Sequence, residues 1–171
     1  MDNEILDVVD GHDRITGTVN RKDYKQFLQE ARGFIRASEL FIMNDAGKLW
    51  VPVRASNKTI APNGYDYSAA GHVESGGNYL GAMIREAQEE IGLQLREDQL
   101  EFFAKLKTRS IRYICCVYLL RSNQAPVLNP HDFQSAEWLT PAELLERIDG
   151  GHPAKSNLRE AVLALQAYLA D

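Results

Sequence analysis

The segment REAQEE, residues 85–90, carries three carboxylates that could bind a metal ion: Glu86, Glu89 and Glu90. Apolar residues recur every three or four positions from 80 to 91, which predicts a helix over residues 78–91 closed by Gly92. Residues three and four apart are neighbours on a helix surface, so the carboxylates fall within an arc of about 100°. A hard divalent cation with oxygen ligands relieves their repulsion, and Mg²⁺ is the candidate. A solvated acidic face is the alternative interpretation of this hexapeptide alone.

Glycines on both sides of the predicted helix favour the metal-binding interpretation. Together with the helix they form a 23-residue stretch, 71–93, that resembles the Nudix box. That pattern is a Gly, five residues, a Glu, seven residues, then Arg-Glu-apolar-any-Glu-Glu-any-Gly-apolar. Eight of the nine defined positions match: Gly71, Arg85, Glu86, Ala87, Glu89, Glu90, Gly92 and Leu93. The ninth departs, because Gly77 stands where the pattern has Glu.

The resemblance implies a pyrophosphohydrolase that depends on Mg²⁺, with Mn²⁺ as a possible substitute. In this family water attacks a phosphorus of a nucleoside 5'-di- or triphosphate, or of a nucleoside diphosphate linked to another group. The family pattern assigns the metal to Glu86, Glu89, Glu90 and the backbone carbonyl of Ala70, and it assigns the orientation of the glutamates to Arg85. A Nudix-fold nucleotide-binding module that has lost catalysis is the alternative, and Gly77 is the feature that favours it.

The layout outside the box is similar to the branch that contains isopentenyl-diphosphate isomerase. Ala70 stands where that isomerase has its catalytic cysteine, and the strand predicted over 34–43 has no counterpart of its metal-binding histidine. Isomerisation needs a proton donor or acceptor on each side of the double bond, so we expect hydrolysis instead. Arg54 and Lys58 match positions that hold the diphosphate in this branch. Solvated loop cations are the alternative for both.

Further candidates lie outside the box. The family often takes its general base from a loop before a final short strand, which makes Asp132 and Glu137 the candidates. Asp132 has the freedom of a loop, whereas Glu137 is expected to anchor the strand edge. His72 resembles a metal ligand of the isomerase branch, but without partner histidines we expect a hydrogen bond within a loop. Glu74 is either a carboxylate behind the metal ligands or one half of a loop salt bridge.

The surrounding pattern predicts an α+β protein with an N-terminal hairpin and helix, in a single domain 1–171. The resemblance implies the Nudix fold, a mixed β-sheet sandwiched between helices (α/β/α). Strands are expected over 5–9, 14–19, 34–43, 49–53, 102–106, 111–120 and 137–139, the pairs 5–9/14–19 and 34–43/49–53 forming hairpins. Helices are expected over 22–32, 78–91, 142–148 and from Ser156 onward, with a loop over 54–64. Tyr65 and Tyr67 could stack on a base, but packing is the commoner role of strand aromatics.

Composition limits the partners. Nineteen Lys and Arg against 24 Asp and Glu give a net charge of −5, which argues against nucleic-acid or membrane-surface binding. The resemblance to the Nudix family implies a small nucleotide as the partner. Cys115 and Cys116 are adjacent, so they cannot join distant segments, and we expect buried thiols. No signal-peptide pattern or membrane-length apolar run is present, which predicts a cytoplasmic protein. The oligomeric state, base, sugar and leaving group stay open.

Overall fold

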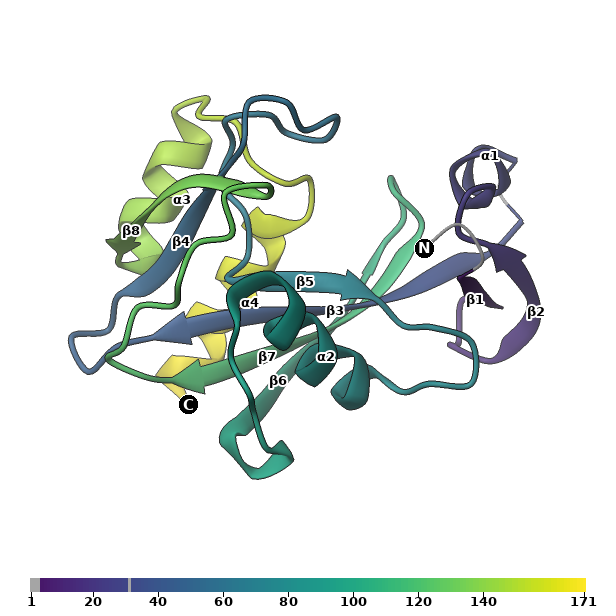
Figure 1. Ribbon diagram of the computed structural model, residues 1–171, viewed down its shortest axis with the longest axis horizontal. Helices are drawn as coiled ribbons and strands as arrows, with labels where there is room; N and C mark the ends of the chain where they lie inside the picture. Colours follow the sequence, from purple (N-terminus) through teal and green to yellow (C-terminus); the bar gives the residue numbers. More distant parts are fainter. Residues whose placement is uncertain (1–3, 31) are drawn as a thin grey trace.

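The computed structural model describes residues 4–30 and 32–171. Its strands form one mixed sheet (Figure 1), with bounds β1 (Ile5–Val9), β2 (Ile15–Asn20), β3 (Phe34–Met43), β4 (Leu49–Arg54), β5 (Ala69–His72), β6 (Leu100–Thr108), β7 (Tyr113–Arg121) and β8 (Phe133–Leu139). The helices are α1 (Tyr24–Gln29), α2 (Tyr79–Ile91), α3 (Pro141–Asp149) and α4 (Leu158–Ala170), with a short 3₁₀ turn, η1 (Glu97–Gln99). None of the described helices is long and apolar enough to cross a membrane.

β3 is the strand around which the layers form. It pairs in parallel with β7 over nine residues and antiparallel with β5 and β1. Its side chains alternate between two cores, as the pleat of a strand requires. Leu40 and Ile42 pack in the core that contains Met83 of α2, whereas Phe41 packs in the core that contains Leu165 of α4. The α/β/α arrangement is therefore confirmed, and β7, buried along most of its length, is the central strand that its apolar run predicts.

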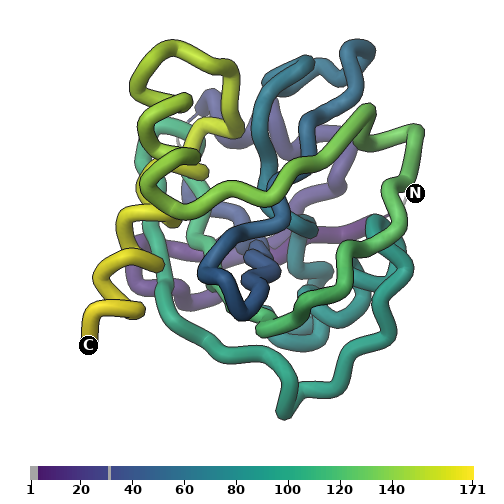
Figure 2. The backbone as a smooth tube through the Cα atoms, turned by 90° about the vertical axis from the view of Figure 1, so that its left-hand side faces the viewer, coloured from purple at the N-terminus to yellow at the C-terminus, as the bar shows by residue number. Residues whose placement is uncertain are grey.

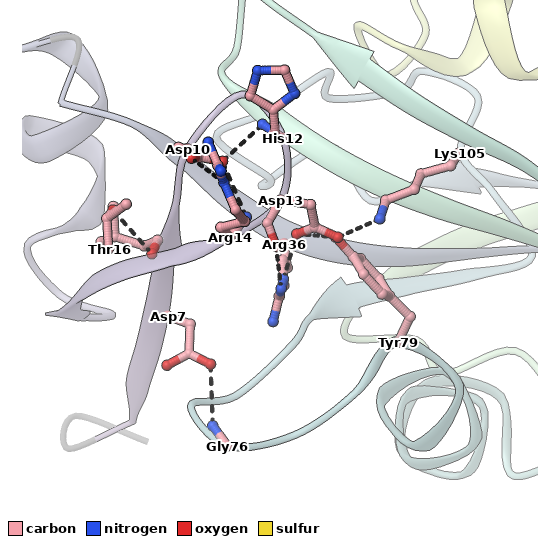
Figure 3. Close-up of polar contacts among 11 residues, drawn as sticks. Asp7, Asp10, His12, Asp13, Arg14, Thr16, Arg36, Gly76, Tyr79 and Lys105 are labelled. Atoms are coloured by element: carbon pink, nitrogen blue, oxygen red, sulfur yellow. Dashed lines mark hydrogen bonds and ion pairs between the residues drawn. The ribbon is translucent and has the colours of Figure 1, made fainter.

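The hairpin β1–β2 holds the segment that leads into α2 (Figure 3). Asp13, in the hairpin turn, accepts hydrogen bonds from Arg36 Nε of β3 at 2.6 Å and from the Tyr79 hydroxyl at 3.0 Å. Asp7 of β1 accepts from Ser75 Oγ at 2.7 Å and from the Gly76 amide at 3.2 Å. The hairpin thus fixes both the loop 73–78 and the first residue of α2.

Several boundaries differ from the sequence prediction. The helix expected over 22–32 extends only from Tyr24 to Gln29, because residues 20–23 form a hydrogen-bonded turn instead; residue 31 lies outside the described residues. Gly33 was expected to end the helix, but it lies instead where the backbone passes close to Val8. A Cβ on residue 33 would lie 2.8 Å from Val8 Cγ1. Strands β3 and β4 pair only at Met43 and Leu49, because β4 turns away to pair with β8.

Two further elements are displaced or longer than expected. The C-terminal helix begins at Leu158 rather than Ser156, and β8 begins at Phe133 rather than residue 137. Residues 122–132, which precede β8, cross the side of the molecule that carries β4 and β8 (Figure 2). The remaining predicted elements are confirmed within a few residues, including the Thr140 capping box that opens α3.

Candidate active site

A cavity of 440 Å³ lies where β3, β5 and β7 meet α2 and the segment before α4. Its lining comes from distant parts of the chain: Glu86 and Glu90 of α2, Ala70 to His72 of β5, Glu39 of β3, Arg54 at the end of β4, and Lys155 to Asn157. Arg21 and Tyr24 of the N-terminal segment close another side. The cavity gathers both signs of charge, so it suits a substrate that carries phosphate together with a metal cation.

Glu86 occupies the space where a side chain of residue 71 would otherwise stand. A Cβ on Gly71 would lie 1.9 Å from Glu86 Cδ, so only glycine fits at this first position of the box. Glu86 is 8% exposed, and its Oε1 lies 2.9 Å from Arg85 Nη1. Burial raises the pKa of the Glu86 carboxyl, although the Arg85 guanidinium opposes that shift.

Glu90 is held by the backbone of β5. Its Oε2 accepts a hydrogen bond from the Ala70 amide at 2.9 Å. Burial raises the pKa of the Glu90 carboxyl to about 8. Because the N–H and C=O of one strand residue point to the same side, the Ala70 carbonyl faces the side on which the Glu90 carboxylate lies. Ala70 and Glu90 can therefore present oxygens to one cation.

Glu89 lies on the outer side of α2. Its side chain is 55% exposed, lies 3.2 Å from Arg85 Nη1, and lines a separate cleft of 430 Å³ with Glu74 and Arg21. The structure thus brings two of the three predicted glutamates together at the cavity. Within residues 4–30 and 32–171, no group of three or more His, Cys, Asp or Glu side chains is gathered closely enough to hold a metal ion.

Arg85 contacts the acidic residues of the box, as expected of an orienting group. Besides Glu86 and Glu89, it lies 3.6 Å from Glu74 Oε1 and donates from Nη2 to the His72 carbonyl at 2.9 Å. Glu74 therefore forms the salt bridge that was one of its two expected roles. Through Nη2, Arg85 ties α2 to the end of β5.

Two cations on the opposite wall share one buried carboxylate. Asp66, 4% exposed, forms ion pairs with Arg54 Nη1 and, at 3.4 Å, with Lys155 Nζ. Arg54 also donates from Nε to the Ile60 carbonyl at 2.7 Å. Burial lowers the pKa of Lys155, but the carboxylates of Asp66, Glu39 and Glu90 outweigh burial, so the pKa lies above its usual value and the ammonium stays charged.

Lys58 and Asp132 lie together, outside the residues that line the cavity. Lys58 Nζ is 2.5 Å from Asp132 Oδ1, and Asn129 Nδ2 donates to Asp132 Oδ2 at 2.8 Å. The Ala55 amide, next to Arg54, donates to the Asp132 carbonyl at 2.9 Å, so this loop adjoins the cavity wall. The roles of Lys58 in substrate binding and Asp132 as base remain predictions.

The other base candidate, Glu137, is engaged at the strand edge. Its Oε1 accepts from the Tyr65 hydroxyl at 2.7 Å and from Arg147 Nη1 at 2.6 Å. Tyr65 and Tyr67 are both buried, in agreement with the packing role. The two cysteines are also buried, as expected.

His72 faces the cavity from β5 rather than from a loop. Its Nε2 lies 3.0 Å from the Tyr113 hydroxyl, and the Tyr24 ring packs edge-on against it with centroids 5.0 Å apart. Burial lowers the pKa of His72 to about 3, so the imidazole is neutral at physiological pH. The predicted hydrogen bond is present, with Tyr113 as its partner.

Sequence reasoning missed Glu39, Lys155 and Asn157. Asn157 Nδ2 donates to Glu39 Oε1 at 2.6 Å across 118 residues of chain. Glu39 is 3% exposed in the middle of an apolar strand, and a lone carboxylate in such a run was the available signal. Lys155 follows the turn-rich segment 149–153 and carries no local signal of function.

Comparison with known proteins agrees with the box and the fold. Residues 34–161 match the NUDIX domain family. A "Nudix hydrolase" of Deinococcus radiodurans is 38% identical over 165 residues, covering 95% of this chain and 94% of the relative. A crystal structure of the D. radiodurans protein DR0079 superposes with a TM-score of 0.80 at 37% identity, covering 93% of this chain and 97% of that one. The chain therefore belongs to the Nudix hydrolases, enzymes that act on phosphorus-containing anhydrides.

The similarity to the isomerase branch is also present among the relatives. An "Isopentenyl-diphosphate Delta-isomerase 1" of Photorhabdus laumondii is 25% identical over 154 residues, covering 86% of this chain and 85% of the relative. At the position of the isomerase cysteine this chain has Ala70, and the two cysteines it does have, Cys115 and Cys116, are on β7.

Proposed function

We propose that this protein is a Mg²⁺-dependent pyrophosphohydrolase that cleaves a phosphoanhydride bond of a nucleoside 5'-di- or triphosphate, or of a nucleoside diphosphate linked to another group. The observation that carries the proposal is the cavity with Glu86 and Glu90 on one wall and Arg54 and Lys155 on the other. Carboxylates suit the metal, and the two cations suit the phosphate oxygens.

The donor set fits a hard divalent cation. The carboxylates of Glu86 and Glu90 and the carbonyl of Ala70 are all oxygen ligands, and both carboxylates are buried with raised pKa values, so a cation would stabilise their charged forms. Mn²⁺ accepts the same ligands. When bound, the metal would neutralise phosphate charge and lower the pKa of a coordinated water. Glu89, on the outer side of α2, would join through a rotamer change or a second ion.

The chain's own residues supply the remaining steps. Arg54 and Lys155 bind phosphate oxygens, and Asp66 behind them fixes their positions. Arg85 orients Glu86 through the contact described above. Asp132, in the loop hydrogen-bonded to Ala55, accepts the proton of the attacking water after its ion pair with Lys58 opens.

The test is incubation of a panel of nucleoside di- and triphosphates with Mg²⁺, with and without a chelator, and resolution of the products by phosphorus NMR. We expect inorganic phosphate or pyrophosphate to appear only with the metal, and Glu86→Gln to abolish it. Turnover that persists unchanged with chelator or in Glu86→Gln would contradict the proposal.

A binding module without catalysis is the second candidate, favoured by Gly77 alone. It predicts saturable nucleotide binding with no product in the same panel. Two buried carboxylates with raised pKa values argue against it, because a module that only binds an anion gains nothing from them.

A further inference from the structure

The cavity has a second end, opposite in character to the end formed by Glu86 and Glu90. Tyr24, His72 and Tyr113 form an uncharged aromatic wall there; the His72 and Tyr113 ring centroids lie 5.7 Å apart. Tyr24 and Tyr113 also border an adjoining cleft of 390 Å³ with Ile60 and Ile111. This end therefore offers aromatic and apolar surface to a part of the substrate that is not phosphate.

Glu39 of β3 also lines the cavity, opposite Ala70 in the sheet, and is incompletely bonded. Oε1 accepts from Asn157 Nδ2, whereas Oε2 is buried and accepts no hydrogen bond within the described part of the chain. The Tyr67 hydroxyl and the Cys115 thiol lie close enough to the carboxyl to lower its pKa. An unsatisfied buried acceptor is unfavourable, and a ligand that donates a hydrogen bond to it would remove the penalty. Burial raises the pKa of the Glu39 carboxyl, and the nearby positive charge of Lys155 opposes that shift.

We propose that the aromatic end binds the nucleobase of the substrate and that Glu39 selects bases that carry an exocyclic amino group. The inference rests on the proposed function and extends it to specificity. Tyr24 contributes to the aromatic wall from the N-terminal segment, which lies before the matched family region 34–161. Arg21, just after the hairpin, and Tyr24 at the start of α1 thus form part of the recognition surface.

Glu39→Gln provides a sharp test because Asn157 fixes the orientation of the new amide. Asn157 Nδ2 donates to the oxygen at the Oε1 position, so the amide NH₂ must take the place of Oε2. The substitution therefore turns the acceptor into a donor at nearly constant shape. A base with a carbonyl at the contact then becomes the preferred partner.

The experiment measures kcat/KM with Mg²⁺ for two matched pairs, cytidine against uridine 5'-diphosphate and adenosine against inosine 5'-diphosphate. We expect the wild type to prefer the amino member of at least one pair by about tenfold or more, and Glu39→Gln to cancel or invert that ratio. Tyr24→Leu should lower kcat/KM equally for both members of a pair. The exposed control Glu97→Gln should leave all four kcat/KM values unchanged. If Glu39 had a purely structural role, Glu39→Gln would lower kcat/KM for both members of a pair by the same factor and leave their ratio unchanged.

Failure of this inference is distinguishable from failure of the proposed function. Hydrolysis of all four diphosphates without an amino preference, or with a preference for the carbonyl members, overturns the role of Glu39 alone. Faster hydrolysis of dimethylallyl diphosphate than of any nucleotide would assign the aromatic end to an apolar chain. If neither these four diphosphates nor the wider nucleotide panel gives product, the proposed function fails. Equal calorimetric affinities of the four for the wild type overturn the base preference alone.

Discussion

The two walls of the cavity differ in how their charges are balanced. On the α2 wall, Glu90 has a backbone amide as its hydrogen-bond donor, and burial raises the pKa values of both Glu86 and Glu90. On the opposite wall, Asp66 is buried between Arg54 and Lys155 and is paired with both. Glu86 is paired with Arg85, but no salt bridge to Glu90 is formed within the described residues, so the α2 wall is less fully paired than the wall around Asp66.

This difference indicates that the residues of the two walls contribute differently to activity and to stability. The α2 wall gains stability when a cation binds. Its residues should therefore be needed for activity and lower the free energy of unfolding of the metal-free protein. A paired wall holds its cations in place before phosphate arrives, so its residues should contribute to both binding and stability. The following substitutions test that contrast.

Glu90→Gln should have the largest effect on activity. We expect turnover to fall by about 10³-fold, because a ligand of the proposed metal is lost. In metal-free buffer the unfolding midpoint should be unchanged or higher, since a buried carboxylate is replaced by a neutral amide. Steady-state kinetics and thermal unfolding, with Glu97→Gln as an exposed control, measure both. An easily unfolded variant with normal turnover would make Glu90 a structural residue.

Asp132→Asn tests whether the predicted base acts from its loop. We expect kcat to fall by about 10²-fold with little change in KM, because a base contributes in the transition state, while the amide keeps the size of the side chain and one of its two contacts with Lys58 and Asn129. The half-buried partner of the ion pair gives the control, because Lys58→Met removes the pair but not the base. Equal effects of the two substitutions would assign Asp132 to loop structure and transfer the base role elsewhere.

Lys155→Met should weaken substrate binding and also destabilise the protein. We expect KM to rise by about ten- to a hundredfold from loss of a charge-assisted contact to phosphate. The free energy of unfolding should fall by about 1–3 kcal/mol, because Asp66 and Glu39 lose a neighbouring positive charge. Lys107→Met, at an exposed position on β6, is the matched control. Retained stability would contradict the paired character of this wall.

The pH dependence of metal-free stability should reveal the less fully paired α2 wall. Burial raises the pKa of Glu90 from 4.5 to about 8, so between these values the folded state keeps a proton that the unfolded chain has lost. The free energy of unfolding should therefore fall as the pH rises to 8, with Glu86 and Glu39 acting in the same direction.

His72 acts in the opposite direction at lower pH. Its pKa is lowered from 6.5 to about 3, so its contribution to stability is lost as the pH falls below 6.5. The clearest window for Glu90 is consequently pH 6.5 to 8. Thermal unfolding midpoints measured in metal-free buffer across this window should decline in the wild type and decline less in Glu90→Gln. A midpoint that rises with pH in the wild type would contradict the raised pKa of Glu90.

The sequence was informative where the determinants are local. Asn78 caps α2 by accepting from the Gly81 amide at 2.8 Å, and Gly92 ends the helix with φ of 67°, so both boundaries follow from residues within one turn. The spacing of the glutamates also predicts their shared helix. It does not reveal that Glu89 faces outward, because that depends on how α2 packs against β5.

The opposite wall could not be predicted, because its contacts are not local. Asn157 lies at the start of α4, where a capping role is the local expectation, yet its side chain bonds Glu39 of β3 instead. Lys155 and Arg54 meet at Asp66 only after β4 and the segment before α4 are brought together. Tertiary packing overrides local preference at these positions.

The smallest expected effect concerns Gly77, where the chain departs from the box. Its φ is not in the left-handed region, unlike that of Gly76 at 78°, so the backbone accepts other residues. A Cβ there would lie 3.0 Å from the Glu74 carbonyl oxygen and must displace it by a few tenths of an ångström. A cleft of 180 Å³ that Gly77 shares with Arg85 leaves room for the longer side chain.

Gly77→Glu should therefore tighten metal binding slightly. A carboxylate beside the N-terminus of α2 is favoured by the helix dipole and would reinforce Arg85, so the half-saturating Mg²⁺ concentration should fall by about two- to fivefold. Turnover against Mg²⁺ concentration measures it, and Gly77→Gln, equal in size but uncharged, separates charge from crowding. An unchanged curve in a folded Gly77→Glu protein would mean that Glu74, already 3.6 Å from Arg85, supplies the charge that the box normally takes from this position.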